Sequence, residues 1–161
     1  MKTIKTKKVL IALDYNPTAQ KVAEYGFSIA SAMNSEIVLL HVISDPVYYS
    51  SGNYSSIMGF TGFLNIDPSQ LNVIEELKKA SLRFLEKSKH HLSDDAIETC
   101  VVEGDCGNSI LMTAKDLHAD IIVMGSHSQK WLENIVMGSV TEKVLRHTSI
   151  PLFIIPTKQN K

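Results

Sequence analysis

The sequence contains few features that would commit it to a specialised environment. Only two of its 161 residues are cysteine, and Cys100 and Cys106 form neither a CxxC pair nor a metal-ligand cluster. This usage is typical of a reducing compartment, so we expect a cytoplasmic protein with no metal site. No apolar run approaches the roughly 20 residues of a membrane-spanning helix, and we therefore expect no membrane partner.

An excess of charge of one sign is also missing. The chain has 16 lysines and arginines against 17 aspartates and glutamates, which gives a net charge of −1. So small a charge excludes a strong global field for nucleic acid, and no nucleic-acid partner is expected. The length and the 44% hydrophobic content are those of one globular domain, so we predict a single domain over 1–161.

Short apolar runs predict the strands. Four of them are compact, three of these are rich in Val and Ile and barely alternate, and they read as strands buried on both faces: Val9–Leu13, Ile37–Ile43, Ile121–Met124 and Leu152–Ile155. The run Ala96–Val102 alternates more, and this pattern predicts a fifth strand at an edge of the sheet.

Helical patterns lie between these runs. Asn16-Pro17 is a helix-start signal, and Asp67-Pro68 repeats it ahead of Leu71, Ile74, Leu77 and Leu85. Ile110, Ala114 and Leu117 mark a third helix, and Ser139-Val140-Thr141-Glu142 fits a capping box that starts a fourth. Such alternation predicts a doubly wound α/β fold, in which right-handed crossovers place helices on both faces of a parallel sheet.

One long connection, 44–66, does not fit this alternation. It contains three glycines and the aromatic residues Tyr48, Tyr49, Tyr54, Phe60 and Phe63. Structureless segments of this length are uncommon in compact domains and are usually functional or disordered. We interpret it as a loop insertion: its Ser, Gly and Asn content favours mobility, and its aromatic residues favour docking on an unidentified protein partner.

The strongest candidate site is a pair of glycine turns. Ligands of doubly wound sheets bind beyond the carboxyl ends of the strands, at the point where the strand order reverses. Gly125-Ser126-His127-Ser128 follows a predicted strand, and nine residues later Gly138-Ser139 opens a predicted helix. Glycines let the backbone approach a ligand closely, and the first N–H groups of a helix favour phosphate. The pair therefore indicates a polyphosphate cradle, with two ordinary turns as the alternative.

The stretch Ile121–Pro156 resembles the C-terminal part of the universal stress protein family, whose nucleotide-binding members carry G-x-x-G-x9-G-[S/T]. The opening KKVLIALD with Asp14, the run IVLLHV, and Glu103-Gly104 before a helix are similar too. The resemblance implies a five-stranded parallel sheet of order 3-2-1-4-5. It also implies a homodimer, and the apolar last strand Leu152–Ile155 is an edge that would pair with its copy.

The resemblance further implies a site for ATP or AMP, with or without Mg²⁺, formed by Ala12, Asp14, Val42, Gly125, Ser128, Gly138 and Ser139. The last glycine and serine, with Gly125, would contact phosphates, and Asp14 would lie near the ribose and phosphates. Ala12 and the backbone of Val42 would flank the adenine. Ser128 replaces the second glycine of the motif, where its side chain would either strain a positive-φ backbone or donate a hydroxyl to phosphate.

Three further residues have competing interpretations. Asp14 follows a strand and would either contact a ligand or cap neighbouring N–H groups. His41 lies within a strand and is interpreted as a core histidine with its hydrogen bonds satisfied. Cys106 lies at a helix start, where thiolate is favoured, and is predicted to react faster than Cys100.

The functional hypothesis is an adenine-nucleotide-binding dimeric switch of the stress response rather than an enzyme. The alternatives are an interaction protein of the same fold without a nucleotide, and a weak ATPase. No nucleophile elbow or paired-carboxylate site is present to favour catalysis.

Overall fold

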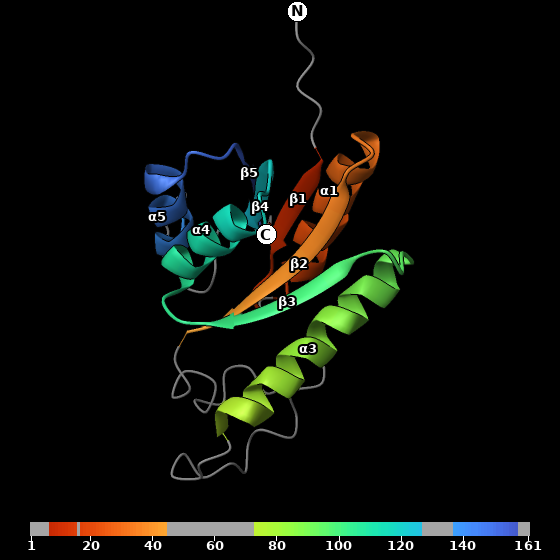
Figure 1. Ribbon diagram of the computed structural model, residues 1–161, viewed down its shortest axis with the longest axis vertical. Coiled ribbons are helices and arrows are strands. Elements are labelled where there is room, and N and C mark those ends of the chain that lie inside the picture. Colours follow the sequence, from red (N-terminus) through yellow and green to blue (C-terminus); the bar gives the residue numbers. More distant parts are fainter. Residues whose placement is uncertain (1–6, 16, 45–72, 127–136, 158–161) are drawn as a thin grey trace, which may run out of the picture.

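The computed structural model describes residues 7–15, 17–44, 73–126 and 137–157. Within these ranges the elements are β1 (Lys8–Ala12), α1 (Ala19–Ala32), β2 (Glu36–Ile43), α3 (Val73–Leu92), β3 (Glu98–Glu103), α4 (Cys106–Asp116), β4 (Ile121–Gly125), α5 (Ser139–His147) and β5 (Leu152–Ile155). All strand pairings are parallel, and the strand order is β3-β2-β1-β4-β5 (Figure 1). The predicted α/β fold and the strand order are confirmed, with β3 at one edge and β5 at the other. The predicted insertion 44–66 lies outside the described residues beyond Ser44, and the single-domain boundary stays a prediction.

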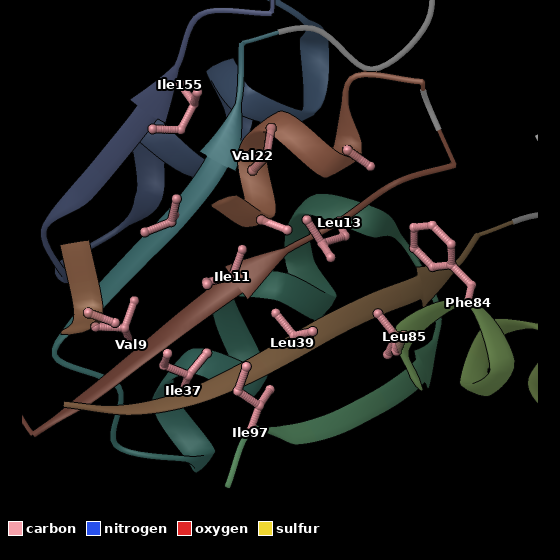
Figure 2. Close-up of a cluster of buried hydrophobic side chains, with 14 of the residues drawn as sticks. Val9, Ile11, Leu13, Val22, Ile37, Leu39, Phe84, Leu85, Ile97 and Ile155 are labelled. Atoms are coloured by element: carbon pink, nitrogen blue, oxygen red, sulfur yellow. The ribbon is translucent and has the colours of Figure 1, made fainter. Parts of the chain in front are cut away.

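The sheet lies between two helical layers (Figure 1). Alternate side chains of β1 enter different layers: Val9 and Ile11 pack in the core under α1 and α3, and Leu10 packs in the core under α4 and α5. Figure 2 shows the first of these cores, where side chains of β1 and β2 meet Phe84 and Leu85 of α3. The continuous apolar runs follow from this arrangement, because a central strand covered on both faces has no solvent-facing side.

Two predicted helix starts are wrong in detail. Helix α1 begins at Ala19, with Thr18 as the N-cap residue, and not at Pro17; Asn16 lies outside the described residues. Helix α5 begins at Ser139 and its N-cap residue is Gly138, without a side-chain cap hydrogen bond. The predicted capping box therefore does not form. Ser139 already has helical backbone, and the Glu142 carboxylate instead accepts a hydrogen bond from Arg146 Nη2 at 2.7 Å.

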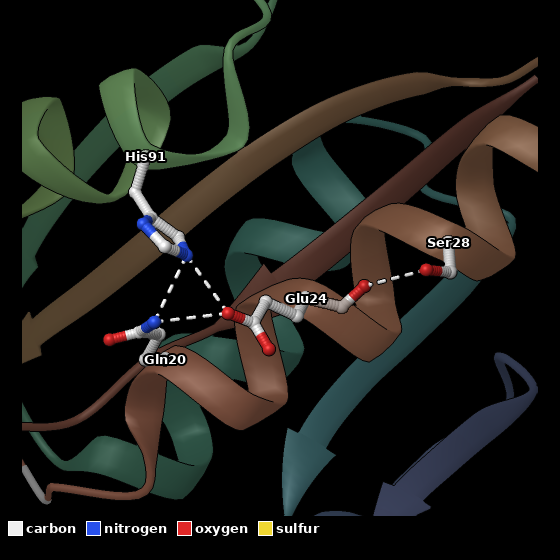
Figure 3. Close-up of polar contacts among 4 residues, drawn as sticks. All are labelled: Gln20, Glu24, Ser28 and His91. Carbon is white, nitrogen blue, oxygen red and sulfur yellow. Dashed lines mark hydrogen bonds and ion pairs between the residues drawn. The ribbon is translucent and has the colours of Figure 1, made fainter.

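A polar contact joins α1 to α3 at the surface (Figure 3). His91 Nε2 lies 2.8 Å from Glu24 Oε1, and Gln20 Nε2 donates a hydrogen bond to the same oxygen at 3.0 Å. The hydrogen bond from Gln20, followed by that with His91, lowers the pKa of Glu24 below its usual value. These groups are about half exposed, so water screens the contact and we expect it to contribute little to stability. Among the described helices, none is long and apolar enough to cross a membrane.

Candidate functional site

A pocket opens at the carboxyl edge of the sheet, where the chain order reverses between β1 and β4. Its empty space, with the solvent-filled mouth included, is about 570 Å³. The described residues that line it come from the ends of β1, β2 and β4, the starts of α1, α4 and α5, and the segment after β5: Ala12, Leu13, Asp14, Thr18, Ala19, Val22, Leu40, His41, Val42, Cys106, Ile110, Met124, Gly125, Val140, Thr141 and Thr157. This is the place that the doubly wound topology predicts for a ligand.

The structure brings four of the seven predicted site residues into this pocket: Ala12, Asp14, Val42 and Gly125. Gly138 and Ser139 are not among the lining residues, although they begin the helix whose next two residues line it. Ser128 lies outside the described residues, so its effect on the loop stays a prediction.

Hydrogen bonds hold the end of β4 against the start of α5. The Gly138 N–H donates to the Ser126 carbonyl at 2.6 Å, and the Thr141 hydroxyl donates to the Gly125 carbonyl at 2.8 Å. The Ser126 N–H donates to the Ile155 carbonyl at 2.9 Å, which ties the same turn to β5. The two glycine turns, whose glycines Gly125 and Gly138 are 13 residues apart in the sequence, are therefore neighbours in space.

The lining of the pocket is partly apolar and partly polar. One apolar wall belongs to the core under α4 and α5 and consists of Ala12, Leu40, Val42, Cys106, Ile110, Met124 and Val140. The polar lining residues are Asp14, His41, Thr18, Thr141 and Thr157, of which His41, Thr141 and Thr157 are buried. Such a combination suits a ligand with one flat apolar ring and a polar remainder, because the apolar wall buries the ring and the polar groups fix its orientation.

His41 is confirmed as a core histidine, being only 3% exposed. Its Nδ1 lies 2.8 Å from the Leu13 carbonyl oxygen. Burial lowers the pKa of His41 to about 4 despite this hydrogen bond, so its ring is neutral at physiological pH. His41 is also among the residues that line the pocket, although its ring packs against Tyr15 and Phe84.

The prediction of a thiolate at Cys106 is wrong. Cys106 is the first residue of α4, as expected, but burial, together with the smaller effect of the negative charges of Asp14 and Asp105, raises the pKa of its thiol to about 11. Burial also raises the pKa of Cys100. Desolvation and two nearby carboxylates outweigh the helix dipole at Cys106, so the site disfavours thiolate chemistry.

We expect native Cys106 to react with iodoacetamide far more slowly than the same cysteine in the urea-unfolded chain. A pKa of about 11, against an ordinary 9.0, leaves about a hundredfold less thiolate at neutral pH. Mass spectrometry of the alkylated peptides would measure both rates. Asp14→Asn should raise the native rate, and equal rates in the native and unfolded chains would contradict the assignment.

Several lining residues were missed although a signal existed for some of them. Met124 precedes Gly125, and Val140 and Thr141 follow Ser139, so their positions at element ends pointed to the pocket edge. The prediction for Cys106 considered only its place at a helix start and not its place in the pocket. Thr157 carries no sequence signal, because it reaches the site through a hydrogen bond from its N–H to the Ser126 hydroxyl and a second one between the two hydroxyl groups.

Comparison with known proteins decides the family. The sequence model described as "Universal stress protein family" matches residues 5–156. The chain belongs to the universal stress protein family. Two curated relatives agree with this. Universal stress protein MJ0577 of Methanocaldococcus jannaschii is 27% identical over 96% of this chain and 97% of its own length. Universal stress protein YxiE of Bacillus subtilis is 27% identical over 92% of this chain and 97% of its own length.

Solved universal stress protein structures have the same fold. The structure of MJ0577 matches with a TM-score of 0.73 at 26% identity, covering 98% of this chain and all of that one. A universal stress protein in complex with cAMP matches with a TM-score of 0.65 at 15% identity, over 96% of this chain and all of that one. The Archaeoglobus fulgidus protein in complex with dAMP matches with a TM-score of 0.59 at 15% identity, over 94% of this chain and 99% of that one. The last two likenesses show the fold alone.

Proposed function

We propose that this universal stress protein binds an adenine nucleotide, ATP or AMP, in the pocket at the carboxyl edge of the sheet. The observation that carries the proposal is the convergence of an apolar wall, the Asp14 carboxylate and two hydrogen-bonded glycine turns at one point. Two structural neighbours were solved with cAMP and dAMP, which supports the adenine class. Ala12 and Val42 would flank the base, and the start of α5 would receive the phosphates.

The charge of the pocket bears on the form of the nucleotide. Among the lining residues that the structure describes, Asp14 is the one carboxylate and none is lysine or arginine. Because a triphosphate carries several negative charges, we include Mg²⁺ in the proposal for ATP but not for AMP. Hydrolysis is outside the proposal, and steady phosphate release from ATP would favour the weak-ATPase alternative instead.

We expect saturating nucleotide to raise the melting temperature and Gly138→Val to remove that rise. A hundredfold excess over Kd stabilises the folded state by about 2.7 kcal/mol, or roughly 5–10 °C for a domain of this size. Gly138 has φ −70° and ψ 157°, which valine adopts readily, so the variant adds bulk at the helix start without backbone strain. Differential scanning fluorimetry with AMP, and with ATP plus MgCl₂, measures the effect.

The matched control for this measurement is Leu145→Val, an exposed position of the same helix. It should keep the full nucleotide-dependent rise. No rise for the unaltered protein at millimolar concentrations of either nucleotide would reject the proposed function and favour an interaction protein without a nucleotide.

We also propose that the protein is a homodimer paired through β5, as a switch between two nucleotide-dependent states would use. The strand is an edge of the sheet with an apolar sequence, and Phe153 is 45% exposed. Exposed apolar edges invite pairing with another strand, and a two-fold axis closes the assembly.

We expect light scattering to give about twice the 17.9 kDa chain mass, and Ile154→Lys to shift this towards the chain mass. The new lysine places a charge in the apolar strand of both copies, which a paired interface would have to bury. Leu82→Lys, on α3 at the opposite edge of the sheet, should leave the mass unchanged. A chain-mass particle for the unaltered protein at micromolar concentration would refute the dimer.

A further inference from the structure

Leu13, the first residue after β1, is held in place by hydrogen bonds on both of its backbone polar groups. The Leu13 N–H donates to the Leu40 carbonyl at 2.8 Å, and His41 Nδ1 lies 2.8 Å from the Leu13 carbonyl oxygen. A carbonyl oxygen only accepts hydrogen bonds, so Nδ1 carries the hydrogen of the neutral imidazole. Both backbone polar groups of Leu13 are therefore bonded to consecutive residues of β2, one residue beyond the end of β1.

Tyr15 is fixed by the same histidine and by α3. Its ring centroid lies 4.0 Å from that of His41 and 4.9 Å from that of Phe84, and its hydroxyl is hydrogen-bonded to the Ser81 hydroxyl. Tyr15, His41, Ser81 and Phe84 are all 3% exposed or less. Close packing at this level leaves Tyr15 little freedom to move.

Asp14 lies between these two anchored residues. Leu13 and Tyr15 both pack in the core under α1 and α3, and Leu13 and Asp14 both line the pocket. Its charge reaches Cys106 on the opposite wall, since it contributes to the raised pKa of that thiol. The anchoring of its two neighbours therefore limits how far the backbone of Asp14, and with it the carboxylate, can move.

We propose that His41 is a positioning residue for Asp14: its Nδ1–H bond to Leu13 and its ring contact with Tyr15 hold the Asp14 carboxylate towards the ligand. This inference rests on the proposed nucleotide site and extends it to a residue that need not touch the ligand. A group held in its bound geometry before the ligand arrives costs less entropy on binding, and a loosened Asp14 would weaken affinity without any lost ligand contact.

The test is isothermal titration calorimetry with AMP, and with ATP plus MgCl₂, on a set of variants. His41→Phe keeps a ring against Tyr15 but removes the donor, and we expect affinity to fall about five- to tenfold, as for one lost hydrogen bond. His41→Asn places an amide N–H close to the position of Nδ1 but removes the ring, so its affinity should lie between that of His41→Phe and that of the unaltered protein. His90→Phe, an exposed histidine of α3, is the matched control and should bind normally.

A double-mutant cycle distinguishes positioning from a general loss of structure. Asp14→Asn should weaken binding about tenfold, and adding His41→Phe to it should weaken binding little further, because the group being positioned is already gone. Losses that multiply in the double variant, or unchanged affinity in His41→Phe, would overturn the inference while leaving the nucleotide site intact. Failure of the unaltered protein to bind either nucleotide would instead reject the proposed function.

A measurement on the unaltered protein keeps the inference falsifiable if His41→Phe does not fold. ¹⁵N-histidine NMR at pH 7 should show His41 as the neutral Nδ1–H tautomer, in agreement with its bond to Leu13. The Nε2–H tautomer would remove the hydrogen bond on which the positioning role depends, and would overturn it.

Discussion

Replacing Phe84 by alanine is expected to lower the free energy of unfolding by about 3–5 kcal/mol. Phe84 is 1% exposed and joins α3 to the core under α1 and α3. Its ring lies edge-on to Tyr15, with centroids 4.9 Å apart, and 5.9 Å from the ring of His41. The substitution therefore removes both buried area and the aromatic contact that supports the residues behind the pocket.

Urea unfolding measures this change. Leu82→Ala is the matched control, because Leu82 lies two residues away on the same helix and is 43% exposed. It should cost less than about 1 kcal/mol, since its side chain loses little contact with the core. Equal costs for the two variants would mean that α3 does not pack on the sheet through Phe84.

Mild acid is expected to destabilise the protein through His41. The ordinary histidine pKa is 6.5, and burial lowers that of His41 to about 4 in the folded state. Between these values the unfolded chain takes up a proton that the folded chain does not, so stability rises with pH. The contribution of His41 is fully present above pH 6.5, is lost as the pH falls to 4, and amounts to about 3 kcal/mol.

The matched comparison is His41→Phe, which has no titrating group at this position. Its stability should change less between pH 6.5 and 4 than that of the unaltered protein. The carboxyl groups whose pKa values are lowered, those of Glu24, Asp105 and Asp120, destabilise both proteins in acid and cancel in the difference. Parallel stability curves over this range would show that His41 is not buried as a neutral ring.

Short-range hydrophobic patterns in the sequence predicted most of the fold. The apolar runs at Val9, Ile37 and Ile121 have no polar face, and a strand without a polar face must be covered on both sides. Together with right-handed crossovers, this left a doubly wound parallel sheet as the expected architecture, and the resemblance supplied its strand order. Helix starts were less certain, because Ser139 and Gly138 are both good N-cap residues and one residue of difference changes which side chain is available to cap.

The sequence predicted those residues of the candidate site that lie at or just after the ends of strands. Gly125 ends β4 and Asp14 follows the end of β1, and the carboxyl ends of parallel strands meet at one edge, so their place in the pocket was expected. Phe84 was not singled out in the helical pattern of Leu77 and Leu85, although it packs with Leu85 in the same core.

What only the tertiary structure decided depends on distances between residues far apart in the chain. The thiol of Cys106 is suppressed by burial and by Asp14, ninety-two residues earlier, and no local pattern encodes that separation. The hydrogen bond from His41 to Leu13 likewise spans 28 residues and exists because β1 and β2 pair in one register. Local sequence set which residues form strands and helices, whereas pKa values and the orientation of Asp14 follow from desolvation and contacts that arise only when the elements pack.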